Sequence, residues 1–448
     1  MNRLNKYLQF FLNLGFEKII NYNFIFIIQR LLGFLLIFVL ANNMSKSDYG
    51  EFAYFITIQF IIVELSHLGL PTIIIKTITQ NLHKRNDLVF GIIVFSILFS
   101  AIGCFVLFLL FNFFNSNLNA SYFSLLTVFT LTSINYIFVA IFTSINKVIL
   151  VHCFESVLKI SIVLILVFLF LFYENLIFQN LVYAYIFSNI FILIFFLYFF
   201  YNDFIKKILF NKINFEFKNY FYSIFFLGIS SIILLLNTKV DVLMLDHFLG
   251  KEKVASYNIG SQISFVGYLS ILSMYAILTP KISIFLKKDK FNLINISLVF
   301  YRSFVFFVIV SISLFYYFFL EKLIILFFGS IYLDAYFPAI ILCFFYTLIS
   351  PFIFSDIILK LSGQEKLVSA CALGSAIINI LLNLFLIPKI GISGAAISTG
   401  LSILFLHNCC FFFMKEKNFF LFLLIKFFFS TKRYKIKKII SKFFIASS

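Results

Sequence analysis

Charged side chains are scarce in this sequence. Only 12% of its 448 residues are Asp, Glu, Lys or Arg, and 62% are apolar. Soluble domains average roughly 25% charged and 45–50% apolar residues. The composition therefore excludes a water-soluble globular domain and predicts a protein that lies almost entirely within a lipid bilayer.

Motifs for catalysis and metal binding are also missing. The sequence has no phosphate-binding P-loop, no His or Cys residues at the spacing of a metal site, and no Ser-His-Asp grouping in a sizeable soluble loop. Its six cysteines lack the loop spacing of a disulfide framework. These absences predict a protein that is not an enzyme and holds no cofactor or metal. They exclude ATP hydrolysis by this chain, so any transport must use an ion gradient, the membrane potential or the substrate's own gradient.

Twelve long apolar stretches, separated by short polar loops, make up most of the chain. A helix needs about 20 apolar residues to cross a hydrocarbon core of roughly 30 Å, and helices satisfy their own backbone hydrogen bonds in lipid. The predicted fold class is therefore an all-α integral membrane protein with about 12 transmembrane helices. The predicted spans are 20–41, 50–72, 88–112, 120–145, 148–172, 178–201, 219–247, 254–280, 293–320, 335–360, 367–387 and 391–412.

The net charge of +17 is distributed unevenly between the loops. If the N-terminus is cytoplasmic, 28 of the 35 Lys and Arg residues lie in cytoplasmic segments and six in outer segments. This is the positive-inside pattern, and it predicts that both termini are cytoplasmic. The basic excess therefore indicates membrane topology, with attraction to anionic lipids as a secondary effect, and no nucleic-acid partner is expected.

The last part of the chain, 415–448, is too interrupted to cross a membrane. Within it, apolar residues between Thr431 and Phe444 alternate with Lys residues at helical spacing. This pattern predicts an amphipathic helix on the anionic inner leaflet. An unstructured basic tail is the alternative.

An internal repeat divides the chain into two halves. Tyr49 and Pro71 in the first half correspond to Tyr257 and Pro280 in the second, at an offset of about 208 residues or six spans. Because six is even, both halves enter the membrane from the same side. The sequence thus predicts an N-terminal lobe at 1–207 and a C-terminal lobe at 208–414, two parallel six-helix lobes around a central cavity that alternate access by rocking.

Charged residues inside the predicted spans are the candidate substrate-binding residues of this cavity. A charge within a bilayer costs roughly 2.5–3.5 kcal/mol on insertion scales, so each internal charge is expected to have a functional or structural role. A guanidinium in a cavity is a strong anchor for phosphate or carboxylate, because it donates two parallel hydrogen bonds. The candidates are Arg30, Glu64, Lys239, Asp241, Asp356 and Lys360.

Structural interpretations of these charges remain open. Asp356 with Lys360, and Glu155 with Lys159, have the i, i+4 spacing of a local ion pair near an interface. Arg30 and Asp241 occupy roughly corresponding depths in the two halves, where they either pair across the cavity or contact substrate.

The segment Asn383 to Thr399 resembles the signature that joins spans eleven and twelve in polysaccharide-exporting flippases. These proteins form the O-antigen flippase family of the multidrug/oligosaccharidyl-lipid/polysaccharide exporter superfamily. The segment Asp241 to Leu245, followed by Ala255-Ser256-Tyr257, resembles their junction of spans seven and eight. The segment Ala41 to Gly50 resembles their first junction. The similarity extends over roughly residues 20–412.

The resemblance implies a fold of two six-helix lobes around a V-shaped cavity and a specific substrate class. This substrate is an oligosaccharide on undecaprenyl pyrophosphate, a unit of O-antigen, capsule or a similar surface glycan, moved to the outer leaflet of a bacterial inner membrane. The expected partners are this lipid-linked glycan, a coupling cation (H⁺ or Na⁺), anionic lipids at the tail and glycan polymerase machinery.

Two other functions remain open. One is a cation-coupled exporter of drugs or other small molecules in the same superfamily, with Glu64 or Asp356 as the ion-binding carboxylate. The other is a membrane enzyme such as a glycan polymerase or ligase, against which the lack of a large outer loop argues.

Overall fold

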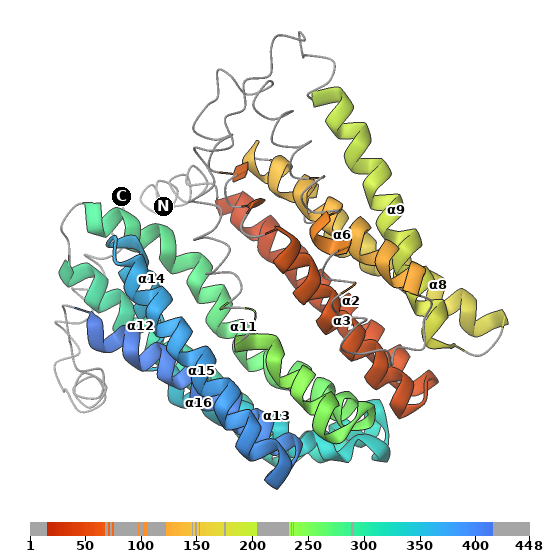
Figure 1. Ribbon diagram of the computed structural model, residues 1–448. Helices are drawn as coiled ribbons and strands as arrows, with labels where there is room; N and C mark the ends of the chain where they lie inside the picture. The colour runs from red at the N-terminus through yellow and green to blue at the C-terminus, as the bar shows by residue number, and fades with distance from the viewer. Residues whose placement is uncertain are drawn as a thin grey trace, which may run out of the picture. The chain divides into compact units, whose positions relative to one another are not determined.

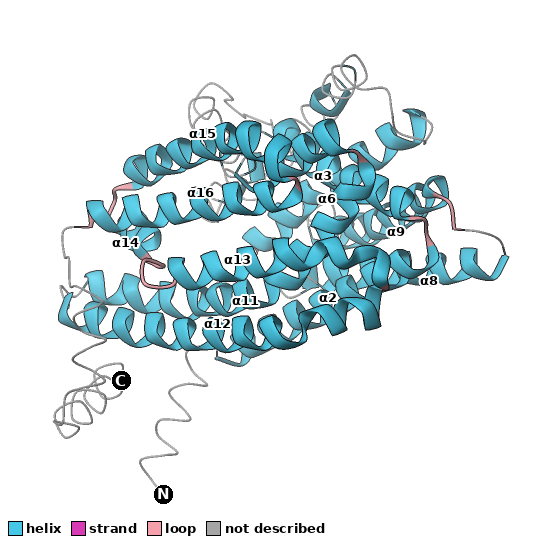
Figure 2. Ribbon diagram, turned by 90° about the horizontal axis from the view of Figure 1, so that it is seen from below, coloured by secondary structure: helices cyan, strands magenta, loops and turns pink. Residues whose placement is uncertain are grey.

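The structure is a computed structural model, and its described residues are helical with short connections. It describes residues 16–67, 122–145, 153–173, 176–203, 237–287 and 291–414, with short stretches at 70–71, 74–75, 97, 102–105, 109, 147, 150–151, 233 and 235. No strand occurs among these residues (Figure 2). The all-α fold class is confirmed. Most of the predicted span 88–112 and the tail 415–448 lie outside the described residues.

The chain forms two compact units, each described by itself. Unit 1 consists of Met1–Asn23, Gly260–Ile324 and Asp334–Ser448, and unit 2 of Phe24–Ile259 and Ile325–Leu333. Unit 2 therefore combines most of the predicted first lobe with residues 208–259 and 325–333 of the predicted second lobe. The lobe boundaries at 207 and 414 stay a prediction.

Unit 2 contains the first helices of the chain (Figure 1). A π-helix, η2, precedes α8, and residues 237–249 form a further helical segment. The helices are α2 (Phe16–Asn43), α3 (Lys46–His67), α6 (Tyr122–Ser144), η2 (Cys153–Leu158), α8 (Lys159–Tyr173) and α9 (Phe178–Asp203). The start of α2, up to Asn23, belongs to unit 1.

Unit 1 contains most of two long helices and the four that follow them. Among these, α15 and α16 lie side by side (Figure 1). The elements are α11 (Lys251–Lys287), α12 (Phe291–Phe328), the 3₁₀ turn η4 (Ser330–Ala335), α13 (Tyr336–Ile349), α14 (Ser355–Leu361), α15 (Glu365–Ile390) and α16 (Ile392–Phe413). The ends of α11 and α12, together with most of η4, belong to unit 2.

Seven of the described helical segments are long and apolar enough to cross a membrane. The predicted spans 120–145 and 178–201 match α6 and α9, and 367–387 and 391–412 match α15 and α16. The chain is thus a multi-pass membrane protein. The total of twelve spans stays a prediction, because parts of the chain are outside the described residues.

The predicted span 335–360 is not a continuous helix. It is interrupted between α13 and α14 at residues 350–354. Phe354 has a φ of 68°, in the left-handed region that a non-glycine residue enters only at a cost. The break exposes backbone groups that a continuous helix would satisfy, so other side chains must bond them.

Aromatic side chains form much of the core of unit 2. Phe55 of α3 is fully buried and stacks against Phe129 of α6, with ring centroids 5.9 Å apart. Phe138 and Phe142 of α6 stack on Phe196 of α9 in the same manner. These contacts fix α3, α6 and α9 relative to one another, which positions the polar residues on their other faces.

A second set of contacts joins α2 and α3 to residues 246–258 and 325–333, at the end of the bundle predicted to be external. The Tyr49 hydroxyl donates to Asn258 Oδ1 at 2.7 Å, and Lys46 Nζ donates to the Ile331 carbonyl at 2.7 Å. Lys251 Nζ pairs with Asp246 at 2.9 Å. Burial lowers the pKa of Lys251, whereas Asp246 favours its charged form. We call this set the outer cluster.

Gly50 lets the outer cluster pack closely, because a Cβ there would overlap the backbone carbonyl of Lys251. We expect Gly50→Ala to lower the free energy of unfolding by about 1–2 kcal/mol, since overpacking forces backbone shifts. Thermal unfolding of the detergent-purified protein measures this change. The matched control is Gly33→Ala in α2, where a Cβ would meet nothing within 4 Å, and which we expect to be neutral or stabilising. Equal melting temperatures of the two variants would contradict the prediction.

Candidate functional site

Four of the six predicted site residues lie in unit 2, on three of its helical segments. Arg30 is on α2, Glu64 on α3, and Lys239 and Asp241 on the helical segment 237–249. Asp356 and Lys360 lie in unit 1, on α14. The six residues are therefore divided between the two units.

Two basic side chains converge in unit 2. Lys239 lies close enough to Arg30 and Asp241 for its ammonium group to interact with both charges. Its Nζ also lies over the Phe60 ring, 5.1 Å from the centroid. Arg30 and Lys239 are both partly exposed. The charge of Arg30 opposes that of Lys239, whereas the charge of Asp241 favours it.

Asp241 is fixed by local hydrogen bonds. Only 4% of it is exposed, its Oδ1 accepts the backbone N–H of Val242 at 2.8 Å, and its Oδ2 accepts the Tyr257 hydroxyl. The bond from Tyr257 joins the segment 237–249 to α11. Asp241 therefore has a structural role beside Lys239, and a direct contact with substrate stays a prediction.

Acidic and aromatic residues converge in another part of unit 2. The Tyr136 hydroxyl of α6 is close enough to interact with the charges of Glu64 and Glu155. Lys159 Nζ pairs with Glu155 Oε1 at 2.9 Å, which confirms the predicted i, i+4 pair. His67 stacks on Tyr136, with ring centroids 5.3 Å apart.

Glu155 lies on the π-helix η2, a form that is rare and often marks functional sites. We call Glu64, Tyr136, Glu155 and Lys159 the acidic-aromatic cluster.

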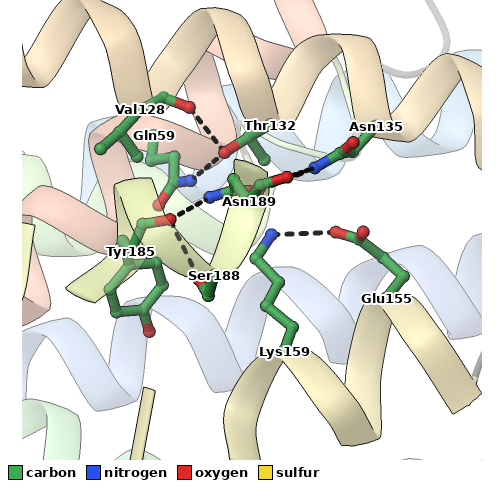
Figure 3. A network of polar contacts seen from close by, with 9 residues as sticks. All are labelled: Gln59, Val128, Thr132, Asn135, Glu155, Lys159, Tyr185, Ser188 and Asn189. Atoms are coloured by element: carbon green, nitrogen blue, oxygen red, sulfur yellow. Dashed lines mark hydrogen bonds and ion pairs between the residues drawn. The ribbon is translucent and has the colours of Figure 1, made fainter. Parts of the chain in front are cut away.

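A network of amide side chains links the helices around this cluster (Figure 3). Gln59 Nε2 of α3 donates to Thr132 Oγ1 at 2.7 Å, and Asn135 Nδ2 of α6 donates to Asn189 Oδ1 at 3.1 Å. Asn189 Nδ2 donates in turn to the Tyr185 carbonyl at 2.8 Å. Hydrogen bonds between amide side chains fix the separation and rotation of neighbouring helices in lipid. This network therefore keeps the acidic-aromatic cluster in place.

In unit 1 the predicted Asp356–Lys360 pair is loose. Their closest N–O distance is 3.8 Å and about half of the Lys360 side chain is exposed, whereas the Tyr275 hydroxyl of α11 donates to Asp356 Oδ1 at 2.5 Å. The same hydroxyl accepts the backbone N–H of Phe354 at 3.1 Å. Asp356 thus helps to brace the break between α13 and α14.

Arg302 is an internal charge that the sequence analysis missed, because it was grouped with the cytoplasmic basic residues. It lies on α12 and is 3% exposed. Its Nε donates to the Ile353 carbonyl and its Nη2 to Ser355 Oγ, each at 2.9 Å. The long apolar run that follows it in α12 was the available signal that this arginine enters a span.

The cysteines and acidic residues do not form a metal centre in the part of the chain that the structure describes. No group of three His, Cys, Asp or Glu residues there is arranged to hold an ion. All six cysteines are free thiols.

Comparisons with known proteins identify a family and a fold. The model of the family described as polysaccharide biosynthesis protein matches residues 16–286. A search of curated proteins finds no match.

Three solved structures are similar over most of both chains. A lipid II flippase, MurJ, in an inward closed conformation has a TM-score of 0.71 and 18% identity, covering 96% of this chain and 97% of its own. An inward-facing multidrug resistance MATE family transporter has a TM-score of 0.68 and 15% identity, covering 86% and 93%. A superfamily transporter from Pyrococcus furiosus has a TM-score of 0.62 and 15% identity, covering 88% and 94%. These likenesses establish the fold shared by MATE transporters and MurJ.

Proposed function

Because the chain belongs to the polysaccharide biosynthesis protein family, we propose that it is a flippase for a lipid-linked oligosaccharide. The substrate is an undecaprenyl-pyrophosphate-linked unit of O-antigen, capsule or a similar surface glycan. The protein moves it across the bacterial inner membrane by alternating access, with both termini in the cytoplasm. The multi-pass fold shared with a lipid II flippase and with MATE transporters supports a transport role over an enzymatic one.

The single observation that supports this substrate best is the convergence of Arg30 and Lys239 inside the membrane-spanning unit 2. A pyrophosphate carries the charge that two neighbouring cations favour, and the guanidinium can bond two of its oxygens at once. The polyprenyl chain would remain in the bilayer while the glycan crosses in a hydrated cavity. Asp356 and Lys360 of unit 1 are the further candidates for substrate-binding charges.

The outer cluster is consistent with alternating access. Its contacts join α2 and α3 to residues 246–258 and 325–333 at the end predicted to be external. In the proposed cycle this end is closed while substrate enters from the inner leaflet, and the polar contacts of Lys46 and Tyr49 break when it opens.

A flipping assay with the purified protein tests the proposal. Sealed liposomes would contain the protein and a fluorescent disaccharide on undecaprenyl pyrophosphate, and a membrane-impermeant quencher would report the outer fraction over time. We expect flipping well above that of protein-free liposomes, and no flipping of a fluorescent phosphatidylcholine control. Equal rates with and without protein would overturn the proposal.

A second function, cation-coupled export of small molecules, is favoured by Glu64 and Glu155 beside Tyr136. Carboxylates within the bilayer are typical of proton and ion pathways. The carboxylate of Asp356 is the other candidate for the coupling ion, H⁺ or Na⁺. Drug resistance conferred by the chain, together with unchanged surface glycan after its deletion, would favour this function over flipping.

A further inference from the structure

His67, the last residue of α3, is a buried histidine whose two ring nitrogens have different surroundings. The side chain is fully buried. Its Nε2 lies 2.9 Å from the Ser133 carbonyl oxygen and 3.0 Å from Ser133 Oγ, both on α6. A carbonyl oxygen only accepts hydrogen bonds, so Nε2 carries the hydrogen and donates to Ser133. In the neutral ring the other nitrogen, Nδ1, is therefore an unprotonated acceptor.

The surroundings of Nδ1 are suited to a protonated ring. In this conformation Nδ1 is shielded from solvent and has no hydrogen-bond partner. The Val63 carbonyl, one turn earlier on α3, accepts the Ser66 hydroxyl at 2.7 Å and lies close enough to interact with a protonated His67 ring. A protonated ring, with two N–H donors, would thus have a carbonyl oxygen on each side, whereas the neutral ring uses only that of Ser133.

The Tyr136 ring of α6 covers one face of His67. The two rings stack with centroids 5.3 Å apart and planes inclined by 29°, and Tyr136 is 40% exposed. The negative face of an aromatic ring attracts a positive charge within about 6 Å of its centroid. This stacking therefore also favours a positive imidazole ring, on the partly accessible side of His67.

A proton is the ligand that this site suits. The ionisable groups of the described elements packed around His67 are Glu64 on α3, Tyr136 on α6 and Cys104 in the short stretch 102–105. Acidic and histidine side chains within a membrane are typical of proton pathways, and an ordinary histidine changes its charge near neutral pH. A sugar or a lipid is too large to reach a fully buried ring nitrogen.

From this geometry we propose that His67 is the proton-binding residue that couples transport by the chain to a proton gradient. The inference rests on the proposed function and leaves Arg30 and Lys239 as the anion-binding residues. In the present conformation the buried ring is neutral. When a conformational change opens this part of unit 2 to water, Nδ1 takes a proton from water and forms an N–H bond, while Nε2 keeps its bond to Ser133.

The test measures how the substrate distributes between the two leaflets at equilibrium. Sealed liposomes contain the protein and the fluorescent lipid-linked disaccharide, the external medium is about two pH units more acidic than the lumen, and valinomycin with equal potassium holds the membrane potential at zero. If one proton enters for each substrate that leaves, the outer-to-inner ratio approaches about 100, because each pH unit corresponds to about tenfold in an equilibrium. An uncoupled flippase would equalise the two leaflets.

A substitution at His67 assigns the coupling to this residue. His67→Gln keeps an N–H donor for the Ser133 carbonyl but cannot be protonated, so we expect slower flipping and a final ratio within about twofold of equality. The matched control is His247→Gln, which removes an exposed histidine from the segment 237–249 and should reach the wild-type ratio. Equal melting temperatures of the two variants and the wild type verify that both variants are folded.

Solid-state nitrogen NMR of the histidine-labelled protein in liposomes provides a readout that needs no transport. The signal that is lost in His67→Gln assigns the ring of His67. At neutral pH we expect a hydrogen on Nε2 and none on Nδ1. At about pH 5, below the ordinary range of histidine, we expect a ring that is protonated on both nitrogens.

The outcomes separate this inference from the proposed function. If the wild-type protein flips nothing, the flippase proposal fails and the NMR measurement decides on the proton site. A hydrogen on Nδ1 at neutral pH, or a ring that is still neutral at about pH 5, would overturn that site. If the wild-type protein flips the substrate but equalises the leaflets under the gradient, or if His67→Gln still concentrates it, the flippase proposal stands and the coupling role of His67 is wrong.

Discussion

Arg30→Ala is expected to lower the rate of flipping of the lipid-linked glycan by about 100-fold or more. In the proposed function, Arg30 donates two charge-assisted hydrogen bonds to the pyrophosphate, and each such bond contributes roughly 1.5–3 kcal/mol. A loss of about 3 kcal/mol corresponds to more than a hundredfold in rate. Lys239 alone holds a phosphate as a point charge and cannot replace the planar fork of the guanidinium. Initial rates in the liposome flipping assay measure the change.

Two further variants make this result specific. Arg30→Lys keeps the positive charge but loses the paired donors, so we expect an intermediate rate. Lys389→Ala removes a positive charge at an exposed position of α15 and is expected to leave the rate unchanged. Full activity of Arg30→Ala, at wild-type protein levels, would show that Arg30 does not bind the substrate.

The helices that the sequence predicts best are those with uninterrupted apolar runs. The predicted span 178–201 corresponds to α9 at Phe178–Asp203, and 391–412 corresponds to α16 at Ile392–Phe413. In these segments, hydrophobicity and backbone hydrogen bonding in lipid favour the same structure, so the composition alone is sufficient. α12 runs to Phe328, eight residues beyond the predicted end at 320, because Glu321 and Lys322 are exposed on a continuing helix and do not end it.

The break at 350–354 was not predictable from hydrophobicity. Pro351 lies inside the break and is a local signal for a kink or an end of a helix, but Phe354 is a residue type that rarely takes positive φ. The conformation depends instead on side chains from distant parts of the chain, Tyr275 and Arg302. Because these contacts span about 50 to 80 residues, the sequence indicates a kink at Pro351 but not the left-handed conformation of Phe354.

Only part of the site could be predicted from the sequence, because the contacts between its side chains join distant segments of the chain. The sequence identified Arg30, Glu64, Lys239 and Asp241 as internal charges. It suggested only that Arg30 and Asp241 pair across the cavity or contact substrate. The structure places Lys239 beside Arg30 and bonds Asp241 to Tyr257. Phe60 and Tyr136 were not singled out, because 71 Phe and 23 Tyr residues hide any individual aromatic ring.

Arg302→Met is expected to lower the free energy of unfolding by about 3 kcal/mol. The guanidinium of Arg302 bonds the Ile353 carbonyl and Ser355 Oγ, one on each side of the residue with positive φ. Methionine keeps most of the apolar stem but leaves the carbonyl of Ile353 without this donor at membrane depth. Hydrogen bonds to charged groups contribute roughly 1.5–3 kcal/mol each, and partners found in the unfolded state reduce this gain. Thermal unfolding in detergent micelles measures the loss.

The matched control is Lys322→Met, which removes an exposed positive charge from the same helix α12 and should leave the melting temperature unchanged. Tyr275→Phe provides an independent test of the brace, because it removes the hydroxyl that bonds both Phe354 N–H and Asp356. If Arg302 and Tyr275 stabilise the same conformation, the double variant is less stable than either single variant, but its loss of stability is smaller than the sum of the two single losses. The reason is that the first substitution already removes part of the structure that the second would destabilise. Additive losses would mean that the two side chains act independently and that the break between α13 and α14 is fixed by other contacts.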